Sequence, residues 1–443
     1  MSFRPSIIEC MFDMTAWDLP PKTDFSGEES ELVEGIAELE RLKAAAAARQ
    51  ARLAAALDAT RRAAEAAAGM PAARRGRGVA AEIALARRDS PARGSRHLGF
   101  AKALVHEMPH TLAALEAGRL SEWRATIVVR ESACLDVEDR RRLDAELCSD
   151  ETGLDGVGDA ALAAAAKAIA YRLDPHAVVD RAARAADERT VTIRPAPDTM
   201  TYVTALLPVG QGVSVYAALK RQADVCCDGR SRGQVMADTL VERVTGRPAA
   251  QPVPVAVNLV ISDQALLGVE NAAAVIAGYG SVPSAVAQNL IAAAVENPDS
   301  LATLRRLYAT PASGALVAMD SRSRAFPKGL AEFIGLRDQR CRTPYCDAPV
   351  RHRDHASPHR RGGATSAANG LGLCERCNYI KEAPGWTVSA EIGENGTHTA
   401  RYTTPTGAHH HSIAPRAPGT PPTPMSEIEV WLNNRLVPIA LAA

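Results

Sequence analysis

Aromatic side chains are scarce in this sequence, in which Phe, Trp and Tyr together make up 4% of 443 residues. Hydrophobic residues of all kinds reach 47%, so there is enough apolar material to build real cores. Cores of this composition are filled mainly by alanine and leucine, which favours packed helices over aromatic-rich sheets. The chain is too long for one small domain, and we expect two or three domains.

Long apolar runs are also absent. No stretch approaches the ~18 consecutive apolar residues of a membrane-spanning helix, so we expect no membrane span. The N-terminus, MSFRPSIIECMFDM, lacks the basic start and apolar run of a secretory signal. Five of the nine cysteines form no disulfide framework, which fits a reduced, cytoplasmic location; these are Cys10, Cys134, Cys148, Cys226 and Cys227.

An excess of charge is missing as well, because 51 Lys and Arg residues balance 51 Asp and Glu residues. Affinity for an anionic partner must therefore come from a local patch. Between residues 340 and 381 there are eight basic and three acidic residues, a local charge of +5. The basic residues are Arg340, Arg342, Arg351, Arg353, Arg360, Arg361, Arg376 and Lys381. A second arginine-rich stretch, residues 71–94, is interpreted as a solvated basic helix and linker, with DNA contact as the alternative.

Helical periodicity dominates the first half of the chain. It runs from Ser30 to a Gly-Met-Pro break at residues 69–71 and resumes from Leu98 to Leu147, where Ser121 is a plausible N-cap. His106 and His110 lie four residues apart, but the proline before His110 breaks the helix that a metal pair would need, so both are interpreted as structural.

Strand patterns appear further along the chain. Residues 190–194 and 200–208 predict a hairpin, and residues 252–262 predict a buried strand. The segments TVSAEI and HTARYT after Trp386 predict another hairpin. A Pro-rich linker and a terminal helix at residues 426–442 are expected to follow.

Two close cysteine pairs carry the clearest chemical signal. Cys341 and Cys346 are separated by four residues, and Cys374 and Cys377 by two. Four thiolates in two short-spaced pairs can surround one zinc ion and tie two chain segments together. Because four cysteines saturate zinc, such a site would be structural, and the alternative is four unrelated cysteines.

Other polar residues between and beside these pairs need a separate explanation. Asp354 offers a carboxylate oxygen and Asn378 an amide oxygen, which suit magnesium, calcium or manganese better than zinc. His355 follows Asp354 directly, so on a strand the two side chains would leave opposite faces unless the backbone bends. Asn378 and Lys381 would share one face of a helix. Gly362 and Gly363 could let backbone N–H groups approach a phosphate.

The order Asp354-His355, Asn369, then C-x-x-C-N-x-x-K resembles the HNH nucleases. The resemblance implies a ββα-metal fold, in which His355 is the general base that activates a water. It also implies Asp354 and Asn378 as ligands of a catalytic Mg²⁺ or Mn²⁺, and Asn369 as the residue that orients the base or braces the loop. Asn378 stands where many members have a final histidine. Nucleic-acid contacts are then expected from residues Arg351, Arg353, Arg360, Arg361, Arg376 and Lys381.

Residues from about Leu98 to Arg247 resemble the DUF222 family, also described as 13E12-repeat-type proteins, in which a domain of unassigned role often precedes an HNH module. The matching phrases include ALVHEMPHTLAALEAGRLSEWRATIVVRESACL and RSRGQVMADTLVERVTG. Together the patterns predict an α+β chain, with a mostly helical N-terminal domain followed by a small zinc-stabilised ββα-metal module. The expected boundaries are 1–29 (flexible N-terminus), 30–290 (DUF222-like), 291–336 (connector), 337–404 (HNH module) and 405–443 (tail and terminal helix).

Several alternatives stay open at this point. Asp354 could be a turn residue, His355 a packed core histidine, and Asn369 and Asn378 helix caps. The chain is accordingly expected to be a DNA endonuclease, with a zinc-stabilised nucleic-acid-binding protein that does not cleave as the alternative. The N-terminal helices are the expected surface for any homo-oligomer.

Overall fold

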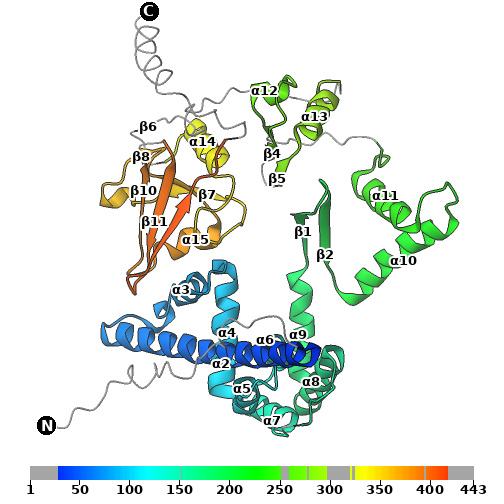
Figure 1. Cartoon of the computed structure of the whole chain (residues 1–443), viewed down its shortest axis with the longest axis vertical. Coiled ribbons are helices and arrows are strands. Elements are labelled where there is room, and N and C mark those ends of the chain that lie inside the picture. The colour runs from blue at the N-terminus through cyan, green and yellow to red at the C-terminus, as the bar shows by residue number, and fades with distance from the viewer. Residues whose placement is uncertain are drawn as a thin grey trace, which may run out of the picture. The chain divides into compact units, whose positions relative to one another are not determined.

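The computed structural model describes residues 28–150, 152–250, 259–276, 279–296, 320–321, 325–393 and 396–417. This part of the chain combines helices with strands that pair antiparallel, and helices dominate its N-terminal half (Figure 1). The expected mixture of helices and strands, with a helical N-terminal region, is confirmed. No helix among the described residues is both long enough and apolar enough to cross a membrane.

The chain divides into two compact units. The first comprises Met1–Leu53 and Lys102–Asp174, and the second comprises Ala54–Ala101 and Pro175–Ala443. The boundary falls inside two helices, α2 (Glu29–Ala67) and α4 (Pro91–Glu107).

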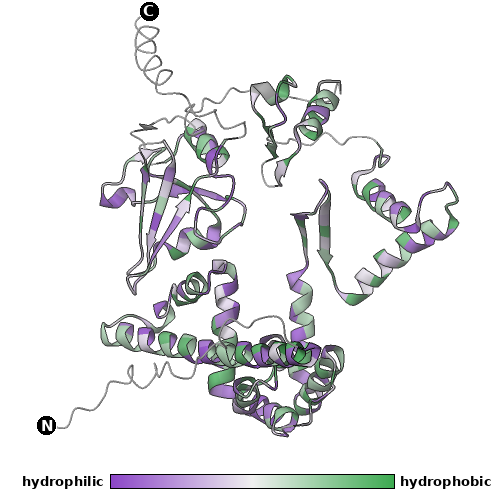
Figure 2. Ribbon diagram, in the orientation of Figure 1, coloured by the Kyte–Doolittle hydropathy of each residue, from purple (hydrophilic) through white to green (hydrophobic). Residues whose placement is uncertain are grey.

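Capped helices build the first unit, which contains α5 (Pro109–Glu116), α6 (Glu122–Glu131), α7 (Val137–Cys148) and α8 (Asp159–Leu173). The helices carry hydrophobic and hydrophilic residues along their length, as expected of helices with one buried face (Figure 2). Ser121 caps α6 by accepting a hydrogen bond from the N–H of Arg124, which confirms the predicted N-cap. The core includes Leu104, Met108, Leu115, Leu143 and Leu162.

The two histidines near Pro109 are part of this helical framework. The buried Asp144 accepts hydrogen bonds from the backbone N–H groups of His110 and Thr111, and so caps the start of α5. His106 lies at the end of α4, and its side chain is exposed.

The second unit begins with the end of α2, η2 (Ala72–Arg74) and α3 (Val79–Ala86), and resumes at α9 (Pro175–Ala185) and η3 (Ala186–Glu188). The predicted hairpin is confirmed as β1 (Thr190–Pro195) and β2 (Thr201–Leu206). Two helices follow, α10 (Val209–Val225) and α11 (Arg232–Thr245).

A small sheet comes next, with the order β3-β4-β5. It consists of β3 (Leu259–Val260), β4 (Ala274–Ile276) and β5 (Gly280–Val282), with α12 (Asp263–Leu266) and α13 (Ser284–Glu296) beside it. Only residues 259 and 260 of the strand predicted at 252–262 are seen as a strand, and residues 252–258 lie outside the described residues. The helix predicted at 426–442 also lies outside them.

Residues 325–417, here called the cysteine module, form the last part of the described chain. Its helices are α14 (Lys328–Asp338), η4 (His359–Arg361) and α15 (Glu375–Ile380). Its strands are β7 (His352–His355), β8 (Thr365–Ser366), β9 (Gly370–Leu373), β10 (Thr387–Ile392), β11 (His398–Thr403) and β12 (His409–Ile413), and β8 also pairs with β6 (Asp320–Ser321). The hairpin predicted after Trp386 is confirmed as β10 and β11. The sheet continues through β12 to Ile413, past the predicted end of the module at residue 404.

A buried charge network braces this module. Asp338, the last residue of α14, pairs with the guanidinium groups of Arg337 and Arg342. It also accepts a hydrogen bond from the N–H of Gly372, at 2.6 Å, which ties α14 to β9. Arg342 is 3% exposed and contacts His398 on β11. Arg342 therefore does not belong to an exposed basic patch, although the sequence count included it.

Candidate functional site

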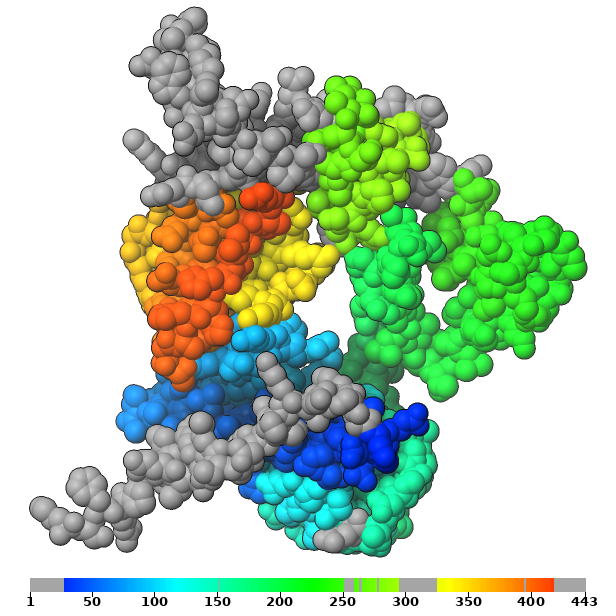
Figure 3. Space-filling model, viewed as in Figure 1, coloured from blue at the N-terminus to red at the C-terminus, as the bar shows by residue number. Residues whose placement is uncertain are grey.

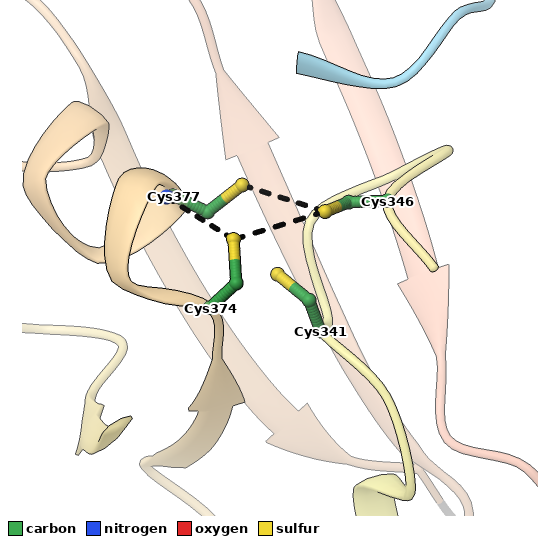
Figure 4. A group of neighbouring side chains, drawn as sticks. All are labelled: Cys341, Cys346, Cys374 and Cys377. Atoms are coloured by element: carbon green, nitrogen blue, oxygen red, sulfur yellow. Dashed lines mark hydrogen bonds between the residues drawn. The ribbon is translucent and has the colours of Figure 1, made fainter. Parts of the chain in front are cut away.

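The four cysteines of the two pairs converge on one point. Cys341 and Cys346 lie in the loop after α14, Cys374 is the N-cap of α15, and Cys377 lies within that helix (Figure 4). Their Sγ atoms all lie within 4.8 Å of one another. The Cys346 Sγ atom is 3.9 Å from that of Cys374 and 3.7 Å from that of Cys377. These separations match the ~3.8 Å edge of a tetrahedron of sulfurs bonded at ~2.3 Å to one zinc ion.

The local backbone explains why the sulfurs meet. Tyr345 adopts a positive φ of 61°, which turns the chain tightly between the first two cysteines. In the second pair, the backbone N–H of Cys377 points at the Cys374 Sγ atom, 3.5 Å away. The thiols are coupled by hydrogen bonds, which lower the pKa of Cys374 and Cys341 and raise the pKa of Cys346 and Cys377. The cluster can hold one metal ion.

A second group of polar residues lies on the elements beside the cysteines. Strands β7 and β9 pair antiparallel, with Asp354 opposite Leu371, and α15 follows β9 directly. His352 and Asp354 are two residues apart on β7 and so share one face of the strand. Asn378 contacts His352, and Lys381 contacts Asp354, so α15 lies against that face. The prediction that Asn378 and Lys381 share a helical face agrees with both contacts.

Asp354 is held as a carboxylate. Its Oδ2 atom lies 3.0 Å from the Lys381 ammonium, and its Oδ1 atom accepts a hydrogen bond from the N–H of His355. Burial by itself raises the pKa of Asp354, but the charge of Lys381 and these hydrogen bonds hold it below the usual value. Lys381 also pairs with Glu382, and its side chain is 3% exposed. Lys381 therefore lies inside the site, and not on the open surface where a DNA-contacting lysine is usually found.

His355 ends β7 and is buried beside this carboxylate. Its Nε2 atom lies 2.8 Å from the Thr365 hydroxyl, and its Nδ1 atom lies 3.4 Å from Asp354 Oδ1. The side chains of Asp354 and His355 thus approach each other, although successive residues of a strand point to opposite faces. The Phe326 ring covers the imidazole at 4.7 Å. Burial lowers the pKa of His355 more than Asp354 raises it, so the ring is neutral near pH 7.

Asn369 braces the loop that follows His355. Its Oδ1 atom accepts a hydrogen bond from the N–H of Ser357, and its Nδ2 atom donates to the carbonyl groups of Ser357 and Ala364. Three bonds from one amide tie both ends of this loop together. The N–H groups of Gly362 and Gly363 donate to carbonyl groups of the same loop, so both glycines serve the turn.

The side-chain oxygen of Asn378, unlike that of Asn369, accepts no hydrogen bond within the part of the chain that the structure describes. Its Nδ2 atom lies 3.2 Å from the His352 Nδ1 atom. Its Oδ1 atom is buried and accepts no hydrogen bond from the described residues. A buried oxygen without a donor is costly, and a bound cation would relieve that cost. The Asp354 carboxylate lies on the same face of β7 as His352, the residue that Asn378 contacts.

The five arginines expected to contact nucleic acid are all exposed: Arg351, Arg353, Arg360, Arg361 and Arg376. Arg360 pairs with Glu382, and Arg376 donates a hydrogen bond to Ser95. Sequence reasoning missed His352, Thr365 and Phe326. The first could have been found from its period-two spacing before Asp354, whereas the other two meet His355 only through the tertiary fold.

The comparisons with known families identify the larger part of the chain. Residues 36–338 match DUF222, a domain of unknown function. The chain belongs to the DUF222 family. The match covers most of the expected DUF222-like range of residues 30–290, continues through the expected connector, and ends just before Cys341. The comparison with curated proteins gives no match, and neither does the comparison with solved structures.

Proposed function

We propose that this DUF222 protein is a metal-dependent DNA endonuclease of the HNH type, with a structural zinc ion held by the four cysteines. The observation that carries the proposal is the Asp354 carboxylate beside the neutral imidazole of His355 at the end of β7. Helix α15 lies against the same strand and carries Asn378, whose buried amide oxygen has no donor among the described residues. The antiparallel strands β7 and β9 followed by α15 have the order of a ββα-metal fold. This is the arrangement that the resemblance of the sequence implies.

Hydrolysis of a phosphodiester needs a base for the attacking water. Because a carboxylate accepts hydrogen bonds, the contact with Asp354 favours the tautomer of His355 that carries its proton on Nδ1. The lone pair on Nε2, at the Thr365 hydroxyl, would then take the proton of that water. Asp354 then stabilises the imidazolium that forms. Asn369 keeps the loop after His355 in place, as the resemblance implies for this position.

A divalent ion at Asp354 and Asn378 Oδ1 would supply positive charge next to the phosphate and the leaving oxygen. Lys381 lies 3.0 Å from Asp354 and balances the charge of its carboxylate. Exposed arginines would hold the DNA backbone, so binding should weaken steeply with salt.

The experiment that tests this function is nicking of a supercoiled plasmid by zinc-loaded protein across a Mn²⁺ or Mg²⁺ series. We expect nicking that depends on the added metal and that needs more metal in an Asp354→Asn variant. Asp347→Asn, a neutralised exposed carboxylate in the same module, serves as the matched control. Absence of nicking on plasmid, single-stranded and branched DNA at every metal concentration would exclude the proposal.

A second candidate is a zinc-stabilised nucleic-acid-binding protein without cleavage. The ion pair between Lys381 and Asp354 favours it, since an ammonium already neutralises the carboxylate that a metal would use. The burial of His355 beneath Phe326 points the same way. Binding of duplex DNA that is unchanged at saturating Mg²⁺, with no product formed, would support this candidate.

A further inference from the structure

Residues of the DUF222 region lie directly against the cysteine module. Ala81 and Leu85 of α3 form one buried cluster with Ala383 and Trp386, which follow α15. At the start of α3, Gly78 has a φ of +89°, and a Cβ atom there would lie 2.5 Å from the Trp386 indole nitrogen. Only glycine allows this close approach. Figure 3 shows the surface of this early segment in contact with the module.

Polar contacts reinforce the same junction. Glu82 of α3 accepts hydrogen bonds from the backbone N–H and the hydroxyl of Thr406, between β11 and β12. Glu82 is also paired with Arg61 at 3.0 Å, and its side chain is 7% exposed. The helix α3 is therefore a fixed neighbour of the module.

The first turn of α4 is brought to α15 by this junction. At Gly94 a Cβ atom would lie 1.9 Å from the carbonyl oxygen of Ala80, so α4 begins in close contact with α3. One residue later, the Ser95 hydroxyl accepts a hydrogen bond of 3.1 Å from the Arg376 guanidinium. Arg376 is one of the exposed arginines expected to contact DNA from α15.

Two further arginines flank Ser95 on α4. Arg93 and Arg96 are exposed, and their spacing of three places them on one side of the helix. Arg93 has only a long, exposed contact with Asp89, at 3.5 Å, and Asp89 is already hydrogen-bonded to His97. Arg96 has no ion pair among the described residues. The first turn of α4, which Arg376 contacts through Ser95, thus carries two further exposed guanidinium groups with one weak carboxylate contact between them in the part of the chain described. This excess of positive charge favours a polyanion as the partner.

We propose that Arg93, Arg96 and Arg376 form one phosphate-binding surface, so that DNA bound at the cysteine module also runs over the first turn of α4. The inference rests on the proposed function, because it takes duplex DNA as the ligand of the module. In this proposal, the DUF222 region helps to bind the DNA substrate. The contacts are to phosphates and carry no sequence information, so they raise affinity for all sequences alike.

The test is binding of a fluorescent duplex of about 30 base pairs to zinc-loaded, full-length protein, followed by anisotropy over about 50 to 300 mM salt with no divalent ion added. Each phosphate contact contributes about 0.9 to the slope of log affinity against log salt. The variant Arg93→Gln/Arg96→Gln should therefore lower the slope by about two and weaken low-salt binding by about tenfold. Arg93→Lys/Arg96→Lys should restore most of the slope, which a merely structural role would not do.

The matched control is Lys220→Gln/Arg221→Gln, which removes the same charge from exposed positions of α10 and should leave the slope unchanged. An α4 variant with the wild-type slope overturns the inference, as does a wild-type protein that binds no duplex DNA. Because the assay contains no divalent ion, it does not depend on cleavage. A protein that shows the slope change but never nicks DNA would keep this inference and lose the proposed nuclease.

Discussion

The Nδ2 atom of Asn378 lies 3.2 Å from the Nδ1 atom of His352. This contact decides which atom of the Asn378 amide, the nitrogen or the oxygen, has no hydrogen-bond partner in the described part of the chain. An amide nitrogen donates, and an unprotonated ring nitrogen accepts. Asn378 Oδ1 is therefore turned away from His352, and it is buried without a donor among the described residues. If Asn378 binds the proposed divalent ion, His352 is the residue that positions this ligand.

Removal of that contact should weaken the metal site without unfolding the module. In His352→Ala the amide can rotate, and we expect the affinity for Mn²⁺ to fall by about tenfold, the lower end for an outer-shell partner. His352→Asn keeps an acceptor near the Nδ1 position and should recover most of the affinity. Titration of zinc-loaded protein with Mn²⁺, followed by electron paramagnetic resonance, measures this without DNA. Equal Mn²⁺ affinity in the wild type and in His352→Ala would refute the role of His352.

Removal of zinc should loosen the cysteine module together with α3. The cysteine cluster lies in the same core as Leu371, Leu373 and Tyr402, and α3 rests on Trp386 just beyond α15. A strong chelator should therefore expose Trp386, which is 4% exposed in the folded chain, and shift its fluorescence to the red.

The assignment to this tryptophan needs a control, because the chain has four. The red shift should be absent in Trp386→Phe and present in Trp123→Phe. An emission spectrum that chelator does not change, in protein shown to have lost its zinc, would contradict the structural role of the cluster.

Asp338 should be among the least replaceable residues of the module. Its carboxylate is fully enclosed and balances two buried guanidinium groups, so its pKa is lowered by them although burial alone would raise it. Asp338→Asn leaves those charges unpaired, and we expect a loss of about 3 to 5 kcal/mol in the free energy of unfolding. Urea unfolding followed by Trp386 fluorescence measures the loss. Asp347→Asn, an exposed carboxylate nearby, should change stability by less than about 0.5 kcal/mol.

His398 should make the module sensitive to acid. Its Nε2 atom donates to the Ala368 carbonyl and its Nδ1 atom accepts from Arg342, and burial lowers its pKa to about 4. Because an unfolded histidine titrates near 6.5, the unfolded chain binds a proton first as the pH falls. Stability should therefore decline between about pH 6.5 and 4, by about 3 kcal/mol in total.

The variant His398→Gln keeps a donor for Ala368 and does not titrate. Its free energy of unfolding should fall less steeply over the same pH window. Both proteins contain the four cysteines, so any effect of acid on the cysteine cluster cancels when the two stability curves are subtracted. Parallel stability curves for wild type and His398→Gln would show that His398 is not the acid-sensitive group.

The sequence predicted the parts of this site that depend on local spacing. The paired cysteines and the shared helical face of Asn378 and Lys381 each follow from residues a few positions apart, whereas the strand at Asp354-His355 was implied only by the resemblance to the HNH nucleases. The sequence could not predict the contacts that depend on how one helix or strand is placed against another. The contact of His352 with Asn378 exists only because α15 lies on one face of β7.

Burial of charge was the least predictable feature. Arg342 and Lys381 were counted as surface cations, since isolated arginines and lysines are rarely enclosed. Both are buried because carboxylates of α14 and β7, Asp338 and Asp354, meet them there. The packing of α3 against Trp386 could not be predicted either, because about three hundred residues separate the partners. No local sequence pattern predicts a contact over that range.

The account rests most heavily on His355 as the base. The decisive measurement is the rate of metal-dependent plasmid nicking by His355→Ala, next to the wild type and to His409→Ala, a histidine variant on the exposed strand β12. Zinc content is measured in all three proteins. We predict a rate about 10² to 10⁴ times lower in His355→Ala, with zinc retained and His409→Ala unchanged. Nicking by His355→Ala at the wild-type rate would contradict the proposed site.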